Sequence, residues 1–337
     1  MNWQETLQGD TLSWLLEPED PGVRYLALRD LVGLPKDDPD LLAAQTLAHQ
    51  AGPIASILEK MEPEGFWARA GHGYNPKYRS TVWSIIVLGQ LGASIQQDER
   101  IARACAYLLD HGLTKIGGFT TNGVPSGTVD CLQGNLCNAL LDLGCQDPRL
   151  EPALEWMARS QTGEGIAPLE DKHAPIRYFA YKCGPDFLCG VNGSKPCAWG
   201  AVKVLLAFSK LPHQQRTPLI EEAIQKGIKF LFSVDPASAA YPTRLDSKPN
   251  RSWWKFGFPI FYVTDILQNV EALVRLGYGK DPRLANALNL IREKQDANGR
   301  WALEYNYIDK TWVNFGEKKM PNKWVSLRAA WVLKHAS

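Results

Sequence analysis

The chain has 337 residues, of which 45% are hydrophobic and 22% charged, and its 37 basic and 36 acidic residues leave a net charge of +1. This near-neutral balance gives no electrostatic case for nucleic acid or an anionic membrane as a partner. The length fits two domains of usual size or one large repetitive domain.

The first residues, MNWQETLQGDTLSW, have neither a basic region nor an apolar segment of the signal-peptide type. No stretch of the chain reaches the length of a membrane span, so we expect no transmembrane segment and a cytoplasmic location. Seven cysteines in that compartment are expected to be reduced, and to serve metal binding, catalysis or packing rather than disulfides.

Helical patterns recur along the chain, and two distant segments align over most of their length. The segment at 143–170 and the segment at 276–304 share Leu-Gly, then Asp-Pro-Arg-Leu, an apolar helical pattern, Gln-x-x-x-Gly and Leu-Glu. Weaker copies of this plan precede and follow the first segment. Repeats of about 45 to 60 residues indicate an array of helical hairpins or a closed ring.

Each repeat contains signals for the start and end of helices. Asp147 and Asp281 precede Pro, which is typical of an N-cap followed by the first helical residue. Gly92, Gly144 and Gly277 follow helical patterns and suit helix C-termini. Each unit is therefore expected to contain a helix ending in Leu-Gly, a tight turn, a second helix and a loop with Gly and an aromatic residue.

The segment KQDANGRW provides the most specific motif, because Gln295, Gly299 and Trp301 match Gln-x-x-x-Gly-x-Trp. It resembles the QW motif of the terpenoid cyclase and protein prenyltransferase superfamily, which includes squalene-hopene cyclases. Gln161 and Gly165 occupy the matching positions of the other copy, where Ala167 stands for the Trp. The chain also resembles short bacterial squalene-cyclase-like proteins through WLLEPEDPGVRYLALRDL, CLQGN, WWKFGFPIFYVTD and PNKWVSLRA.

The resemblance implies an all-α fold, an α/α toroid in which inner and outer helices surround a central cavity. We expect one domain over residues 1–337, built of about five to six helical hairpins. Closure of the ring is implied by the resemblance alone, because the repeats would also permit an open solenoid.

If the repeats are equivalent, the helices that end in Leu-Gly lie in one layer, and the resemblance makes this the inner layer. Their starts then gather at one mouth of the ring. Aligning the segments places Arg79, Cys131, Cys197 and Asp265 on this common rim.

The loop KCGPDFLCGVNGSKPC brings two further cysteines toward the same helix start. We predict a tetrahedral zinc site from four thiols, namely Cys131, Cys183, Cys189 and Cys197. The alternatives are buried packing, since free Cys is often buried, and reactive thiols. Protein prenyltransferases also hold zinc at such a mouth, but their Asp-x-Cys pattern is replaced here by adjacent Asp130 and Cys131.

Asp265 is the best candidate for a catalytic acid. The Asp-x-Asp-Asp motif of class II terpene cyclases and an aspartate-rich motif for magnesium are both absent from the sequence. Asp265 follows the aromatic run FGFPIFYVT, which could desolvate the carboxyl and raise its pKa. The alternative is a structural acid that binds backbone N–H groups at a helix start.

Two stretches supply candidate substrate contacts. In the loop GHGYNPKYRS, His72, Tyr74 and Arg79 could meet an anionic group, although the loop could also be an exposed connection. The aromatic candidates for a hydrophobic substrate or a carbocation are Trp254, Phe258 and Tyr262, with core packing as the alternative.

Three functions remain open from the sequence. The first is a terpene-cyclase-like enzyme that acts on a hydrophobic, isoprenoid-type small molecule in the central cavity, with Asp265 as the acid. The second is a zinc-dependent transferase or hydrolase at the cysteine cluster, and the third is a non-enzymatic ring that binds a lipid or a partner. The oligomeric state does not follow from the sequence.

Overall fold

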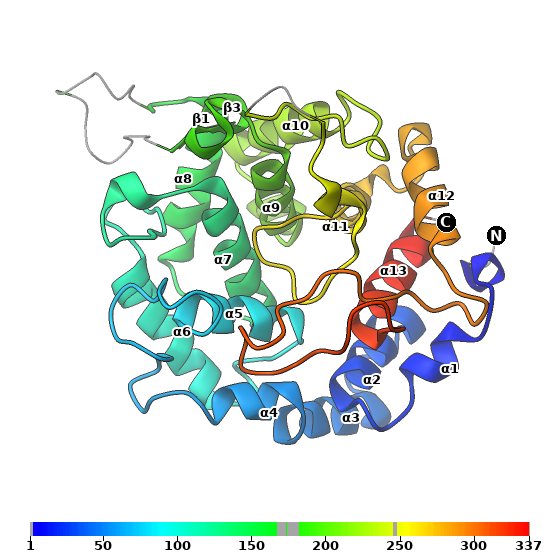
Figure 1. The fold of residues 1–337 in the computed structure, drawn as a ribbon. Coiled ribbons are helices and arrows are strands. Elements are labelled where there is room, and N and C mark those ends of the chain that lie inside the picture. Colours follow the sequence, from blue (N-terminus) through cyan, green and yellow to red (C-terminus); the bar gives the residue numbers. More distant parts are fainter. Residues whose placement is uncertain (1–2, 167–172, 174–181, 245–247, 337) are drawn as a thin grey trace.

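The structure is a computed structural model that describes residues 3–166, 173, 182–244 and 248–336. The chain is mainly helical in these ranges (Figure 1). The helices of the first half are α1 (Thr11–Leu15), α2 (Pro21–Ala27), α3 (Pro39–Gln50), α4 (Pro53–Leu58), α5 (Thr81–Gln90), α6 (Glu99–Gly112), α7 (Asp130–Asp142) and α8 (Leu150–Thr162). Those of the second half are α9 (Ala198–Ser209), α10 (Pro218–Leu231), α11 (Ile266–Leu273), α12 (Ala285–Glu293) and α13 (Lys323–His335). None of the described helices has the length and hydropathy of a membrane span.

The helices form two layers that differ in burial. In α5 every residue from Thr81 to Gly89 is buried, and α9 is buried from Ala198 to Phe208 except at Trp199. Helices α6, α8, α10 and α12 instead bury one face and expose charged residues on the other. This alternation is expected when helices rich in apolar residues lie inside a ring of amphipathic ones.

Contacts between the inner helices run in a circuit. Helix α5 packs on α7, α7 on α9, α9 on α11 and α11 on α13, and α13 returns to α1 and α2 near the N-terminus (Figure 1). The remaining gap in the circuit, between α2 and the end of α5, closes where Gly92 packs against Leu26 of α2. A Cβ atom added at Gly92 would lie only 2.7 Å from Leu26 Cδ2, which is too close for a side chain. Gly92 also has φ 75°, so the residue suits this close approach in two ways.

Three turns between helices share one polar arrangement. They precede α6, α8 and α12, and in each an Asp accepts a 2.9 Å hydrogen bond from the backbone N–H of an Arg two residues later. The guanidinium of that Arg also ion-pairs with the same carboxylate; the pairs are Asp98–Arg100, Asp147–Arg149 and Asp281–Arg283. The predicted glycine helix ends are confirmed by left-handed φ values of 75°, 84° and 92° at Gly92, Gly144 and Gly277.

The loops after the outer helices also repeat. Trp67 Nε1 donates to Ile57 O and Trp301 Nε1 donates to Ile291 O, each over 2.8 Å and ten residues. Isolated bridges close the matching turns at Met61–Trp67, Leu113–Phe119 and Gln295–Trp301. Gln295 reaches the N-terminal segment, because Gln8 N–H donates to Gln295 Oε1 over 3.0 Å. The KQDANGRW turn is therefore a structural brace.

The all-α prediction needs one correction. The strands β1 (Cys183–Gly184), β2 (Leu188–Cys189) and β3 (Lys195–Pro196) form a small antiparallel sheet in the order β1-β2-β3. Cys183 pairs with Cys189 in the register, and Cys189 pairs with Lys195. Strands of two residues show no period in sequence, so hydrophobic patterning does not predict them.

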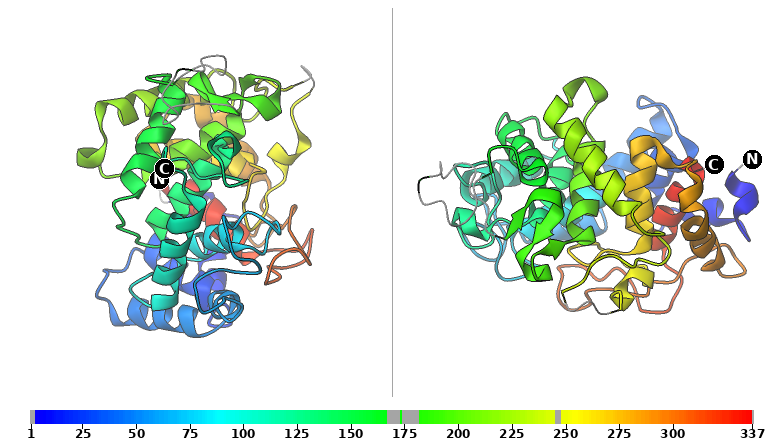
Figure 2. Two further views of the ribbon diagram at one scale, coloured as in Figure 1. Left: turned by 90° about the vertical axis from the view of Figure 1, so that its left-hand side faces the viewer. Right: turned by 90° about the horizontal axis from the view of Figure 1, so that it is seen from above.

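The loops that join the helices gather on one face of the circuit, toward the viewer in Figure 1 (Figure 2). Segments 255–264 and 302–322 cross the middle of the circuit there (Figure 1). Their aromatic rings pack on inner helices: Phe258 stacks on Trp324 of α13 at 4.8 Å, and Phe261 meets Trp83 of α5 at 5.2 Å between ring centroids. Much of the predicted aromatic cluster therefore forms core.

Candidate functional site

A pocket of about 750 Å³ lies on the loop face, at the starts of α7 and α9. The β2–β3 region and further loop residues complete its walls, namely Tyr74, Asn75, Lys77, Thr121, residues 241–244, Lys248, Asn250, Trp253 and Tyr262. Apolar and aromatic lining residues include Val129, Ala198, Trp199, Tyr241, Trp253 and Tyr262. Such a concave, largely apolar cavity with a few polar groups is the usual form of a small-molecule site.

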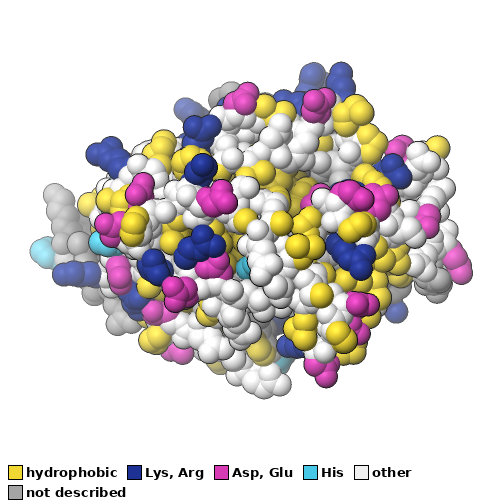
Figure 3. All heavy atoms as spheres, turned by 90° about the horizontal axis from the view of Figure 1, so that it is seen from below, with side chains coloured by type: hydrophobic (Ala, Val, Ile, Leu, Met, Phe, Trp, Pro, Cys, Tyr) yellow, Lys and Arg dark blue, Asp and Glu magenta, His cyan; other side chains and the backbone are white. Residues whose placement is uncertain are grey.

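The charged side chains in the described pocket lining are all basic. They are Lys77, Lys182, Arg244 and Lys248. The surface on the α3 and α4 side is different, because acidic, basic and hydrophobic side chains are interspersed there (Figure 3). A one-sign lining on a nearly neutral protein concentrates positive potential at the pocket and favours an anionic group in the ligand.

Three of the four predicted zinc thiols line this pocket. Cys131 is the second residue of α7, Cys197 is the N-cap of α9, and Cys189 lies in β2. Cys183 is buried instead, and its sulfur lies 3.6 Å from Thr128 O. Of the four residues that the repeat alignment places on one rim, Cys131 and Cys197 line this pocket at the starts of α7 and α9, whereas Arg79 and Asp265 do not.

Cys131, Cys189 and Cys197 line one cavity, and the pKa values of two of these thiols are raised. A side-chain hydrogen bond to Cys131 raises the pKa of Cys197 to about 12. The hydrogen bond to Cys197 and burial likewise raise the pKa of Cys189. Cys189 and Cys197 are therefore protonated thiols at neutral pH.

These thiols do not form a recognisable metal site. Among the described residues, no group of three or more His, Cys, Asp or Glu side chains is arranged to hold a metal ion. A structural zinc needs four ligands around one point, whereas Cys183 is absent from the described pocket lining and its sulfur is directed to Thr128 O. The geometry therefore does not support zinc, and zinc binding stays a prediction for metal analysis.

Behind the thiols lies a buried carboxyl group. Asp130 begins α7 and is 5% exposed, and burial, helped by the nearby Cys189, raises its pKa to about 8. Gln161 Nε2 donates to Asp130 Oδ1 over 2.8 Å, while Gln161 Oε1 accepts from Phe187 N–H over 3.0 Å. Phe187 O in turn accepts from Cys197 N–H over 2.9 Å. Gln161 therefore positions both helix starts that carry the thiols.

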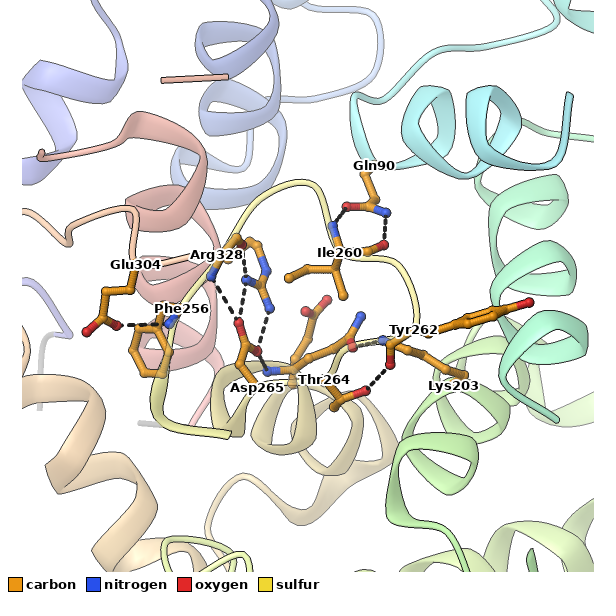
Figure 4. Close-up of polar contacts among 12 residues, drawn as sticks. Gln90, Lys203, Phe256, Ile260, Tyr262, Thr264, Asp265, Glu304 and Arg328 are labelled. Carbon is orange, nitrogen blue, oxygen red and sulfur yellow. Dashed lines mark hydrogen bonds and ion pairs between the residues drawn. The ribbon is translucent and has the colours of Figure 1, made fainter. Parts of the chain in front are cut away.

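A buried lysine, Lys203, lies on α9, the helix that has Cys197 as its N-cap. Lys203 of α9 is 1% exposed and donates to Gln268 Oε1 of α11 (Figure 4). Burial lowers the pKa of Lys203 to about 7, so the amine is partly neutral at physiological pH. The sequence did not single out this residue, because a Lys in a helical pattern is usually exposed.

Asp265, the predicted acid, is fully engaged. It is the N-cap of α11, and its carboxylate accepts from Gln268 N–H over 2.7 Å and from Gly257 N–H over 3.3 Å. Arg328 binds both oxygens at 3.0 and 3.1 Å (Figure 4). The carboxylate oxygens are thus occupied by a guanidinium and backbone donors, and Asp265 does not line the described pocket. This geometry favours the structural alternative.

The predicted substrate contacts separate into two groups. Tyr74 and Tyr262 line the pocket, whereas His72, Arg79, Trp254 and Phe258 do not. Arg79 is exposed and donates to Asp309 O over 3.0 Å, and Trp254 Nε1 donates to Ala237 O over 3.0 Å. Phe258 is core. Lys77 of the basic lining lies in the predicted loop GHGYNPKYRS, but Lys182, Arg244 and Lys248 were missed, because loops without periodicity give no signal of where they fold.

No protein-family model matches the chain. Among solved structures, a variant of the type II terpene cyclase MstE from Scytonema in complex with merosterolic acid A is 16% identical, with a TM-score of 0.41 over 99% of this chain and 86% of that one. A protein from Actinoplanes is 15% identical, with a TM-score of 0.32 over 87% and 99%. Another MstE variant, with geranylgeranyl dihydroxybenzoate, is 13% identical, with a TM-score of 0.32 over 88% and 97%. No function follows from similarity at this level.

Proposed function

We propose that the chain is a single-domain, terpene-cyclase-like α/α toroid that binds a hydrophobic, isoprenoid-type molecule with an anionic end. The observation that carries the proposal is the pocket of about 750 Å³, which combines an aromatic wall with four basic side chains. The circuit of inner helices and the repeated turns support the toroid part of the proposal.

The pocket surfaces suit the two ends of such a molecule. Trp199, Tyr241, Trp253 and Tyr262 offer flat apolar surfaces, and each 100 Å² of apolar ligand area removed from water contributes about 2.5 kcal/mol. Unsaturated chains also pack well on aromatic faces. The basic side chains would hold a phosphate or carboxylate, since Lys and Arg bind such groups through charge-assisted hydrogen bonds.

Chemical conversion of the bound ligand is a separate part of the proposal. Protonation of an alkene requires an acid that touches the ligand, and Asp265 is occupied by Arg328 outside the described pocket lining. We therefore propose binding as the primary function and cyclisation as an activity to be measured with the same ligand. If Asp265 is structural, Asp265→Asn will lower stability and leave ligand affinity within about twofold.

Binding is tested with geranylgeranyl diphosphate as the probe, by quenching of tryptophan fluorescence and by calorimetry. Geranylgeraniol and inorganic diphosphate separate the contributions of the chain and the head group. We expect the intact probe to bind at least tenfold more tightly than either part. The variant Lys77→Gln/Arg244→Gln should weaken the intact probe about tenfold, which is ~1.4 kcal/mol, and leave geranylgeraniol unchanged.

A matched control is Lys115→Gln/Arg251→Gln, which removes two cations outside the described pocket lining. Equal binding of the probe by both double variants and the unchanged protein would show that the basic lining does not recognise the ligand. Product analysis by gas chromatography of the same incubations then detects or excludes cyclisation of this probe.

A zinc-dependent reaction and a purely non-enzymatic ring are the two competing functions. The first requires bound zinc, so metal analysis of protein purified under reducing conditions decides it. A purely non-enzymatic ring would bind the probes as described above but would form no product from any prenyl probe.

A further inference from the structure

The pocket of the proposed function also gathers thiols. Cys131, Cys189 and Cys197 are partly exposed and line it, whereas the other four cysteines are buried and do not. Partly exposed thiols are open to small reagents, while buried thiols are usually inert packing groups. Three partly exposed thiols in one largely apolar pocket therefore present nucleophilic sulfur to a molecule that enters it.

Of the three thiols, Cys131 has the position that best favours its ionised form. It is the second residue of the 13-residue helix α7, where the free backbone N–H groups of the first turn and the helix dipole favour negative charge. The neighbouring Asp130 carboxyl is mainly uncharged at neutral pH and does not oppose this charge, because burial raises its pKa to about 8. Cys189 lies in a strand, and Cys197 makes no side-chain hydrogen bond to the first turn of α9. We therefore expect Cys131 to react first.

The same pocket contains a hydrogen-bond donor without a partner. Tyr262 lines the pocket, and its buried hydroxyl has no hydrogen-bond partner among the described residues. Its ring packs against those of Trp83 and Tyr74, with 5.4 and 6.5 Å between ring centroids. Because buried hydroxyl groups are usually hydrogen-bonded, the missing partner points to an acceptor on a ligand, such as a carbonyl oxygen.

We propose that the pocket is a covalent capture site, in which the Cys131 thiol adds to a hydrophobic α,β-unsaturated carbonyl compound that carries a carboxylate. The apolar walls would hold the hydrocarbon part, the basic side chains would attract the carboxylate, and the Tyr262 hydroxyl would donate to the carbonyl oxygen. The site uses the pocket of the proposed function but does not require that an isoprenoid binds there.

The reaction is a conjugate addition and balances without another reactant. The Cys131 thiolate forms a bond to the β-carbon of the C=C–C=O unit, and the π-electrons move to the carbonyl oxygen to give an enolate. The proton that left the thiol returns, through water, to the α-carbon. One S–C and one C–H bond form, while the S–H bond and the C=C π-bond are lost, so no oxidant or reductant is involved.

The charge of the pocket suits both stages of this addition. The charged side chains in the described lining are all basic, namely Lys77, Lys182, Arg244 and Lys248. Positive potential in a confined pocket favours the thiolate before the addition and the negative oxygen of the enolate after it. A donated hydrogen bond from Tyr262 would act on the same oxygen, where the charge develops.

The test uses the full chain, reduced, treated with a metal chelator and desalted, with one equivalent of the vinyl ketone 11-oxotridec-12-enoic acid or of its methyl ester. Intact mass spectrometry should show the summed mass of protein and probe, and peptide mapping should place the first adduct on Cys131. The acid should react with the protein at least tenfold faster than with N-acetylcysteine. Cys131→Ser should slow the first adduct at least tenfold. Lys77→Gln/Arg244→Gln should remove the preference for the acid over the ester, and Tyr262→Phe should slow both probes.

The matched controls are Cys105→Ala and Lys115→Gln/Arg251→Gln, which change a thiol and two cations outside the described pocket lining and should react like the unchanged protein. Mapping of the unchanged protein decides the proposal even if a variant fails to fold. A first adduct on a cysteine other than Cys131, or a rate no higher than that of N-acetylcysteine, would show that the proposal is wrong. Binding of geranylgeranyl diphosphate is reversible and is measured without the vinyl ketone, so failure of one proposal does not decide the other.

Discussion

The turn that contains Gln295 and the matching turn that contains Gln161 have different roles in this molecule. Gln295 and Trp301 close a short turn in which the Gln binds the N-terminal segment and the Trp is fully buried. Gln161 occupies the matching position of the other copy, but it binds Asp130 and the backbone of Phe187, 26 residues further along the chain. The first turn braces the fold, whereas the second holds the loop that carries the pocket thiols. A repeat can thus keep its bracing side chain while a longer loop supplies a site.

The largest expected effect is at the short turn. Trp301→Ala removes a fully buried indole and its hydrogen bond to Ile291 O, and such truncations cost about 3–5 kcal/mol of unfolding free energy. Urea denaturation measures this loss. The pocket thiols should react with a small thiol reagent as before in the folded fraction, because Trp301 does not line the described pocket. A change in the reactivity of Cys197 would mean that the two turns are coupled.

The next effect concerns Asp130 and depends on pH. Burial raises its folded pKa from 3.8 to about 8, so the folded state binds more protons than the unfolded state between these values. The contribution of Asp130 to stability is therefore fully present below pH 4 and is lost as pH rises toward 8, by at most about 1.4 kcal/mol per pH unit. Asp130→Asn should remove this slope.

The measurement is the unfolding free energy of both proteins at pH 5, 6 and 7. We expect the difference to shift in favour of Asp130→Asn by up to about 2.7 kcal/mol between pH 5 and pH 7. Asp142→Asn is the control, because Asp142 lies at the other end of α7 and pairs with Lys210 near the surface. A parallel pH dependence in the unchanged protein and Asp130→Asn would show that Asp130 is ionised in the folded protein.

The smallest expected effect is the difference in stability between variants of Gln161 and Gln295. Gln161→Ala leaves Asp130 Oδ1 and Phe187 N–H without their partner, and buried groups left in this way cost about 1–3 kcal/mol. Gln295→Ala should cost less, about 1 kcal/mol, because its partners are only partly buried. Labelling of Cys197 by a small thiol reagent separates the two further. Gln161→Ala should alter the rate of labelling at Cys197, because Gln161 binds Phe187 and Phe187 O accepts from Cys197 N–H, and Gln295→Ala should not.

Much of the helical scaffold can be predicted from the sequence, because the signals for helix starts, helix ends and turns are local. Glycines after Leu, aspartates before the outer helices and apolar runs in the inner helices each fix a short segment, and their repetition places Cys131 and Cys197 at equivalent helix starts. The structure confirms these features. Helix and turn signals of this kind do not depend on which other segment lies nearby.

The site depends on distant segments, and much of it could not be predicted for that reason. The engagement of Asp265 depends on Arg328 of α13, which lies 63 residues away and meets it only after the circuit closes. The basic lining depends on where Lys182, Arg244 and Lys248 are placed, and the direction of Cys183 depends on strands of two residues. Periodicity carries no information on such contacts.

The brace at Gln295 also has a consequence for the order of folding. Gln8 and Gln295 are 287 residues apart, and Thr11 donates to Gly299 O across 288 residues, so these contacts close loops that span most of the chain. Long-range closure costs chain entropy that local hairpins do not, and it is expected to form late and to open first. In hydrogen–deuterium exchange, the Gln8 amide should therefore exchange faster than the Phe119 amide, which donates to Gln133 Oε1 only 14 residues away.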